Sequence, residues 1–129
     1  MKVIILNGSP KAKGNTATAL REVEKTLNQQ GIETEFIHVG NKDIRGCIAC
    51  NGCWKSGLCA FDDIGNEISM KMRDADGLLV GSPVYVASPN GTLLALLDRL
   101  FYSNLHTDWS MKVGASVSIA RRAGTTTTM

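Results

Sequence analysis

The sequence has no apolar run approaching the ~18 residues that a membrane-spanning helix needs. Its first apolar stretch, residues 3–6, is also shorter than the roughly seven apolar residues of a secretory signal, so we expect a cytoplasmic protein. Neither sign of charge is in large excess, since 14 lysines and arginines against 12 aspartates and glutamates leave a formal net charge of +2. That balance argues against a nucleic-acid-binding protein, which would carry clustered basic residues. With 43% apolar and 20% charged residues, the chain is neither disordered nor collagen-like.

Internal repeats and linkers are absent as well, and 129 residues allow one domain and little more. Short segments made up largely of apolar residues alternate along the chain with segments in which apolar residues recur at the spacing of a helix. The first kind predicts strands at residues 3–6, 34–39, 77–81 and 112–119. The second kind predicts helices at residues 16–30, from 62 onward and from 90 onward. This alternation is typical of a parallel sheet covered by helices on both sides, so we expect an α/β fold.

No fifth strand and helix follow the fourth strand. We therefore expect a flavodoxin-like three-layer sandwich with strand order 2-1-3-4, cut short at its C-terminal end, in which the fourth strand is a bare edge. Ligands of such sheets bind at the carboxyl ends of the strands, where the strand order reverses. The loops at that point are residues 7–16 and 82–92, which follow the first and third strands.

The first of these loops joins a buried strand to a helix and is rich in groups that bind phosphate. Phosphate can accept hydrogen bonds from the N–H groups of the helix start and from the side chains of Ser9, Asn15 and Thr16. Either Lys11 or Lys13 adds a positive charge, and Gly14 allows the backbone to approach the ligand closely. The spacing fits neither a P-loop nor G-x-G-x-x-G. An alternative without a ligand is a strand–helix turn in which Ser9 and Asn15 cap the start of the helix. We expect Asn15 to be the N-cap of this helix and Gly31 to follow its end.

The second loop begins with Ser82-Pro83-Val84-Tyr85. Pro83 ends the strand because it has no N–H group, while Val84 and Tyr85 offer a flat apolar surface with backbone N–H groups beside it. Such a surface suits a flat ring with polar edges, such as a flavin. The alternative is that Tyr85 is a surface aromatic residue covering the end of the sheet.

The two loops together resemble a known family. The motifs Asn7–Lys11 with Gly14–Thr16, Gly81–Tyr85, Pro89–Gly91 and Asp98-Arg99 are similar, at matching spacings, to those of NADPH-dependent FMN reductase-like proteins of flavodoxin fold. The resemblance covers the whole chain and implies an FMN-binding domain over residues 1–129. It implies that the FMN phosphate is held by Ser9, Lys11, Asn15 and Thr16, that residues 83–85 lie against the ring, and that a later loop, Ser118 to Gly124, completes the pocket. We assign no chemistry to Asp98 or Arg99.

All four cysteines lie in one loop, residues 46–60. The pattern C-x2-C-x2-C-x5-C is formed by Cys47, Cys50, Cys53 and Cys59. Four thiols in one short loop of a cytosolic chain indicate metal or redox chemistry rather than disulfides. Spacing alone leaves open an iron–sulfur cluster, zinc, or free thiols. The motif resembles that of iron–sulfur flavoproteins, a branch of the same family. It differs from ferredoxins in that no proline follows the last cysteine. That resemblance implies a [4Fe-4S] cluster near the flavin of a neighbouring subunit.

We therefore expect an FMN-dependent oxidoreductase that takes electrons from NAD(P)H and passes them to a quinone, a flavin, an oxygen species or a redox carrier protein. The alternatives are a flavodoxin-type electron carrier without turnover of its own, and a thiol or zinc redox sensor. We expect no membrane or nucleic-acid partner and, from the family, a homo-oligomer (dimer or tetramer). Because flavin chemistry needs no protein base, His38 and His106 are expected to be structural.

Overall fold

The computed structural model describes residues 1–105 and 109–128, so His106 lies outside the described residues. The strands are β1 (Lys2–Asn7), β2 (Glu33–His38), β3 (Gly77–Pro83) and β4 (Val113–Ile119). The helices are α1 (Asn15–Gln29), α2 (Cys53–Ser56), α3 (Ile64–Arg73), α4 (Gly91–Ser103) and α5 (Thr125–Thr128). The short helix α2 interrupts the cysteine-bearing segment, which the sequence predicts as a continuous loop.

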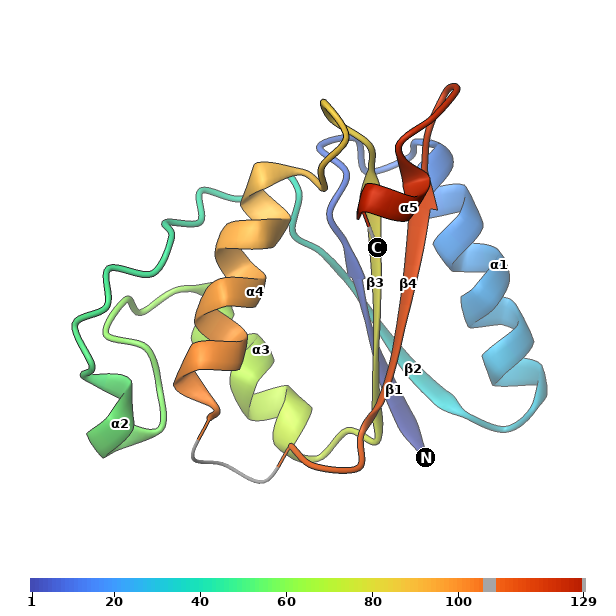
Figure 1. Cartoon of the computed structure of the whole chain (residues 1–129). Helices are drawn as coiled ribbons and strands as arrows, with labels where there is room; N and C mark the ends of the chain where they lie inside the picture. Colours follow the sequence, from blue (N-terminus) through green and yellow to red (C-terminus); the bar gives the residue numbers. More distant parts are fainter. Residues whose placement is uncertain (106–108, 129) are drawn as a thin grey trace.

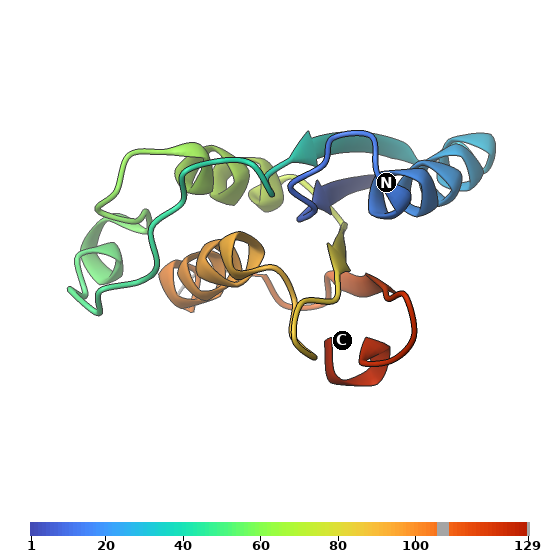
Figure 2. The same ribbon diagram turned by 90° about the horizontal axis from the view of Figure 1, so that it is seen from above.

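The strands form one sheet in the order β2-β1-β3-β4, and every neighbouring pair is parallel, as the sequence predicts. Asn7, the last residue of β1, lies opposite both His38, the last residue of β2, and Gly81 of β3. Strands β1 and β2 therefore end at the same level, and β3 continues beyond it to Pro83. Helix α1 covers one face of the sheet, and α3 and α4 cover the other (Figure 2). The three layers confirm the flavodoxin-like α/β architecture.

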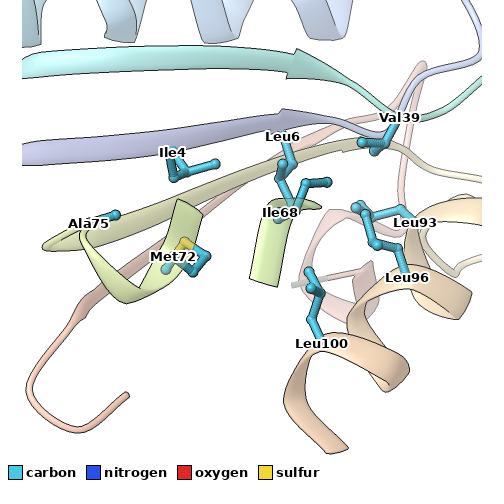
Figure 3. Packing of buried hydrophobic residues seen from close by; sticks show 9 residues of the cluster. All are labelled: Ile4, Leu6, Val39, Ile68, Met72, Ala75, Leu93, Leu96 and Leu100. Atoms are coloured by element: carbon cyan, nitrogen blue, oxygen red, sulfur yellow. The ribbon is translucent and has the colours of Figure 1, made fainter. Parts of the chain in front are cut away.

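The apolar core lies on both faces of β1, because side chains of a strand point alternately to opposite sides. Ile4 and Leu6 face α3 and α4, whereas Ile5 faces α1. Figure 3 shows the larger cluster between the sheet and the two helices, which consists of Ile4, Leu6, Val39, Ile68, Met72, Ala75, Leu93, Leu96 and Leu100. A fully buried β1 explains its continuous apolar run and makes the strand a rigid base for the loop that follows it.

The helix starts agree with the sequence in two cases of three. Asp63 caps α3, since its Oδ1 accepts a hydrogen bond from Gly65 N at 2.8 Å. Asn90 caps α4 in the same way, accepting from Thr92 N at 2.9 Å. The prediction that Asn15 caps α1 is wrong, because the cap position belongs to Gly14 and Asn15 is already helical. The exposed Asn15 amide therefore has no capping role in this structure.

The outer strand β4 is the most exposed strand of the sheet, and its Val113 side chain is 63% exposed. Strand β4 is thus the edge strand that the sequence predicts, with no further strand paired to it among the described residues. The short helix α5, which the sequence does not predict, lies against β4, so the strand is not left bare. Within residues 1–105 and 109–128, no helix combines the length and the apolar character needed to cross a membrane.

Candidate functional site

The loop after β1 is held by hydrogen bonds from its backbone N–H groups to one backbone oxygen and two side-chain oxygens. Gly8 N donates to Gly81 O at 2.8 Å, which ties the loop to the end of β3. Ser9 N donates to Asn7 Oδ1 at 3.0 Å, and Lys11 N donates to Ser9 Oγ at 3.2 Å. These bonds close a compact turn that leads directly into the start of α1, where the first N–H groups of a helix have no partner within the helix.

The predicted phosphate ligands divide into a buried and an exposed pair around this turn. Ser9 and Thr16 are buried, at 6% and 2% exposure, whereas Lys11 and Asn15 are exposed. Gly14 lies between the pairs, at the N-cap of α1. The structure thus brings all five residues onto one loop and one helix start.

The end of β2 fixes the other side of the same loop, a contact that the sequence analysis missed. Gly40 N donates to Asn7 O at 3.1 Å, and His38 Nε2 lies 2.7 Å from Ser9 O. A Cβ atom on residue 40 would lie only 2.2 Å from Ser9 O, so only glycine fits there. In the sequence, the only indication of this contact is Gly40 itself, a glycine directly after the strand predicted at residues 34–39.

The segment after β3 forms a short shelf, residues 83–88, joined to β4. Val84 N donates to Ile119 O at 2.9 Å, which links the ends of the two strands. Tyr85 and Ser88 exchange backbone hydrogen bonds of 2.8 and 2.9 Å across a two-residue turn at Val86 and Ala87. Both turn residues have positive φ, 50° and 58°, which is strained for a residue other than glycine, asparagine or aspartate. The Tyr85 side chain is 47% exposed and is available to a ligand.

The loop after β4, which the family resemblance assigns to the flavin pocket, packs against this shelf. Gly124 has a φ of +97°, and a Cβ atom there would lie 2.9 Å from Val84 Cγ1. The loop after β1, the shelf and the loop after β4 therefore gather at one end of the sheet (Figure 1).

Two buried polar atoms at this end of the sheet have no hydrogen-bond partner among the described residues. They are Asn7 Nδ2, at the end of β1, and Ser118 Oγ, near the end of β4. A buried polar group without a partner costs about 1–3 kcal/mol. A ligand with polar atoms would remove that cost, so the residues present fit a group such as FMN.

The four cysteines line one small cavity of about 20 Å³, together with Arg99 and Tyr102. Cys47 and Cys50 are exposed, Cys59 is half-buried, and Cys53 is buried. Burial raises the pKa of the Cys53 thiol above its usual value. In the part of the chain that the structure describes, no three or more Cys, His, Asp or Glu side chains are arranged to hold a metal ion. Thiolates are suitable ligands for iron. A cavity of this size holds only about one water, so the loop would have to open to admit a cluster.

Arg99 of α4 is the central residue of this cavity, and the sequence analysis assigned it no role. Its side chain is 1% exposed and bonds to both Asp63 oxygens, from Nη1 at 2.6 Å and from Nη2 at 2.8 Å. It also donates from Nε to Cys59 Sγ at 3.2 Å. Its remaining bonds go to the carbonyl oxygens of Arg45, at 3.2 Å, and Phe61, at 3.1 Å. One side chain therefore ties α4, the start of α3 and both ends of the cysteine loop together.

The opposite charges of Asp63 and Arg99 stabilise each other. Partial burial acts to raise the pKa of Asp63, but hydrogen bonds from Arg99 and from Gly65 N outweigh it and hold that pKa below its usual value. The same bond from Asp63 raises the pKa of the Arg99 guanidinium. Both groups are thus charged at neutral pH, with Arg99 buried and Asp63 partly exposed.

The sequence model of NADPH-dependent FMN reductases matches residues 1–129 of this chain. The chain belongs to the NADPH-dependent FMN reductase family. An iron–sulfur flavoprotein of Methanocaldococcus jannaschii is 40% identical over 131 residues, which cover all of this chain and 68% of that protein. An iron–sulfur flavoprotein of Methanosarcina thermophila is 32% identical over 120 residues, which cover 92% of this chain and 63% of that protein.

Solved structures agree on the fold. RosB, solved with 8-demethyl-8-formylriboflavin-5'-phosphate, superposes with a TM-score of 0.78 at 20% identity, over 99% of this chain and 55% of RosB. A flavone reductase superposes with a TM-score of 0.72 at 21% identity, over 99% of this chain and 46% of that chain. The chain thus spans about two thirds of these two iron–sulfur flavoproteins and about half of each structure. The comparisons confirm the predicted family and the α/β fold of this FMN reductase relative.

Proposed function

We propose that this chain is the FMN-binding domain, residues 1–129, of an oxidoreductase that takes electrons from NAD(P)H. The observation that carries the proposal is the meeting of three loops at the carboxyl end of one parallel sheet, beside the two unpartnered buried atoms Asn7 Nδ2 and Ser118 Oγ. Sheets of this class bind ligands at that end. Membership of the FMN reductase family supports the same cofactor.

In this proposal the phosphate of FMN lies on the loop after β1. Its oxygens accept hydrogen bonds from the N–H groups at the start of α1 and from the Ser9 and Thr16 hydroxyls. Lys11 supplies a positive charge, and the exposed Asn15 amide adds a donor. Gly14, which has no side chain at the helix cap, leaves the backbone open to the anion.

The flavin ring lies over the shelf in the same proposal. Pro83, Val84 and Tyr85 contact its face, and Ser118 Oγ donates to a polar atom of the ring or the chain attached to it. Bound FMN supplies hydride acceptance from NAD(P)H and the return of electrons to an acceptor. The role of the protein is to orient the ring and to exclude water from one of its faces.

We propose further that Cys47, Cys50, Cys53 and Cys59 hold a [4Fe-4S] cluster, so that electrons leave singly. The names of the M. jannaschii and M. thermophila relatives support the cluster, and all four cysteines line one cavity. The cysteine loop lies beyond α4, away from the end of α1 where FMN would bind (Figures 1 and 2). That separation favours a homo-oligomer in which cluster and flavin of different subunits meet. The acceptor is then a quinone, a flavin, an oxygen species or a carrier protein.

The test is an anaerobic visible spectrum of the purified chain titrated with FMN, together with assays of iron and acid-labile sulfide. Replacing Asn15 with alanine should weaken FMN binding by about tenfold, the value of one good charge-assisted hydrogen bond. Gln29→Ala, at the exposed far end of the same helix, is the matched control. Unchanged FMN affinity in Asn15→Ala would refute the phosphate site. Absence of NAD(P)H oxidation with a quinone or ferricyanide, despite FMN binding, would favour the electron carrier.

A further inference from the structure

The bond between Arg99 and Cys59 distinguishes Cys59 from the other three cysteines. Cys47 and Cys50 lie on an exposed segment that contains two residues of positive φ, Ala49 and Asn51. Cys53 begins the single turn of α2. Among the described residues, Cys59 is the cysteine whose sulfur accepts a hydrogen bond from a buried, charged side chain, at 3.2 Å.

A second contact fixes the backbone of Cys59. Its N–H group donates to Asn66 Oδ1 at 2.8 Å, and its carbonyl oxygen accepts from Asn66 Nδ2 at 2.9 Å. Asn66 belongs to α3 and is 9% exposed. Both the main chain and the sulfur of Cys59 are therefore attached to helices of the folded core, before any ligand is present.

We propose that Arg99 is the positioning residue of the four-cysteine site and makes Cys59 its preformed ligand. This inference rests on the proposed cluster and assigns different roles to its cysteine ligands. Arg99 and Asn66 hold Cys59 in place before iron binds, while Cys47 and Cys50 would supply their thiolates from the exposed segment.

The hydrogen bond from Arg99 also has an electronic consequence for the bound cluster. A donor aimed at a ligating sulfur stabilises negative charge on the cluster, which increases on reduction, so the bond raises the reduction potential. Lysine cannot replace this arrangement, because its single nitrogen cannot bond to both Asp63 oxygens, two carbonyls and a sulfur at once. The proposal therefore concerns the geometry of the guanidinium as well as its charge.

The experiment compares Arg99→Lys with Arg73→Lys after anaerobic reconstitution with ferrous iron and sulfide. Arg73 is a matched control because it contacts the same segment, at Gly57 O, 3.3 Å away, from an exposed position. Arg99→Lys should lower cluster occupancy at limiting iron by about tenfold, the usual effect of losing a residue that orients a ligand. Any cluster that forms should have a more negative midpoint potential. FMN affinity should stay at the wild-type value, and Arg73→Lys should change none of these quantities.

Each outcome decides a different point. Wild-type occupancy and an unchanged potential in Arg99→Lys would overturn the role of Arg99 and leave the cluster intact. Absence of iron and sulfide from the reconstituted wild-type chain would overturn both the cluster and this role, without affecting the FMN site. If Arg99→Lys loses FMN binding as well, Asp63→Asn decides instead, since it keeps the helix cap but loosens the guanidinium. That variant should lower cluster occupancy at limiting iron, as Arg99→Lys does, and wild-type occupancy in it would refute the proposal.

Discussion

The loop after β1 and the loop after β2 leave neighbouring strands at the same end of the sheet, yet they are held by different groups. Backbone atoms fix the first loop, through Gly8 N to Gly81 O and through Gly40 N to Asn7 O. The second loop is longer, and side chains hold it, above all Arg99 with its bonds to Asp63, Cys59 and two carbonyls. The conformation of the first loop should therefore be disturbed by added side-chain volume, as at Gly40. The conformation of the second loop should be disturbed by loss of the charged Arg99 side chain.

The largest effect should follow the removal of Arg99. Arg99→Met leaves Asp63 partly buried without its charge partner, and loss of one partner of a buried ion pair costs about 3–5 kcal/mol. Urea unfolding followed by circular dichroism should show a loss of stability of that size. Arg73→Met, at an exposed position, should change stability by about 0.5 kcal/mol or less. Similar stabilities for the two variants would contradict the view that one side chain holds the cysteine loop.

A smaller but clear effect is expected from Gly40→Ala. The added methyl group would overlap Ser9 O, and forcing volume into a closed site costs about 1–3 kcal/mol. Thermal unfolding and FMN affinity should both reveal the displaced loop. Gly46→Ala is the matched control in the cysteine loop, since a Cβ there would meet no atom within 4 Å. If both variants match the wild type, the first loop is less tightly packed than its contacts indicate.

Val86→Asn should stabilise the shelf, in contrast to the two losses above. Val86 is fully exposed and has a φ of 50°, so asparagine relieves backbone strain without loss of packing. We expect a gain of about 1 kcal/mol in the free energy of unfolding. The same substitution at Val113, an exposed residue of strand β4, should reduce stability because asparagine is unfavourable in strands. A loss at both positions would show that the turn at 86–87 is not strained.

The smallest effect concerns pH. Because the pKa of Asp63 is held below its usual value of 3.8, its charged form stabilises the fold. This contribution is complete above the usual pKa and is lost as pH falls from there through the lower folded-state pKa. The difference in unfolding free energy between wild type and Asp63→Asn should therefore shrink as pH is lowered below about 4. Asp62→Asn is the exposed neighbouring control, and a pH-independent difference for Asp63→Asn would contradict the assignment.

Much of the fold and part of the site could be predicted without coordinates. Continuous apolar runs predict the buried strands, and helical spacing predicts the helices that begin near residues 62 and 90, because both patterns are local. The carboxyl-end rule for parallel sheets predicts that the loops after β1 and β3 meet. The cap of α1 was misplaced by one residue, since an asparagine before a helix can equally be its first residue.

Other features depend on residues far apart in the sequence. Arg99 is 36 residues from Asp63 and 54 from Arg45, and on a helix rich in leucine its burial has no local pattern. His38 contacts Ser9, 29 residues away in the sequence. The need for glycine at position 40 follows only from its closeness to the Ser9 carbonyl oxygen. No periodicity or motif encodes such pairs.

The sequence by itself determined where the strands and the main helices lie and to which family the chain belongs, because these follow from local propensity and short motifs. Only the tertiary structure decided that a buried arginine holds the cysteine loop and that the end of β2 fixes the phosphate loop. The physical reason is that hydrogen bonds and close packing between distant segments depend on where the sheet places those segments. The order of residues along the chain does not contain that placement in any local form.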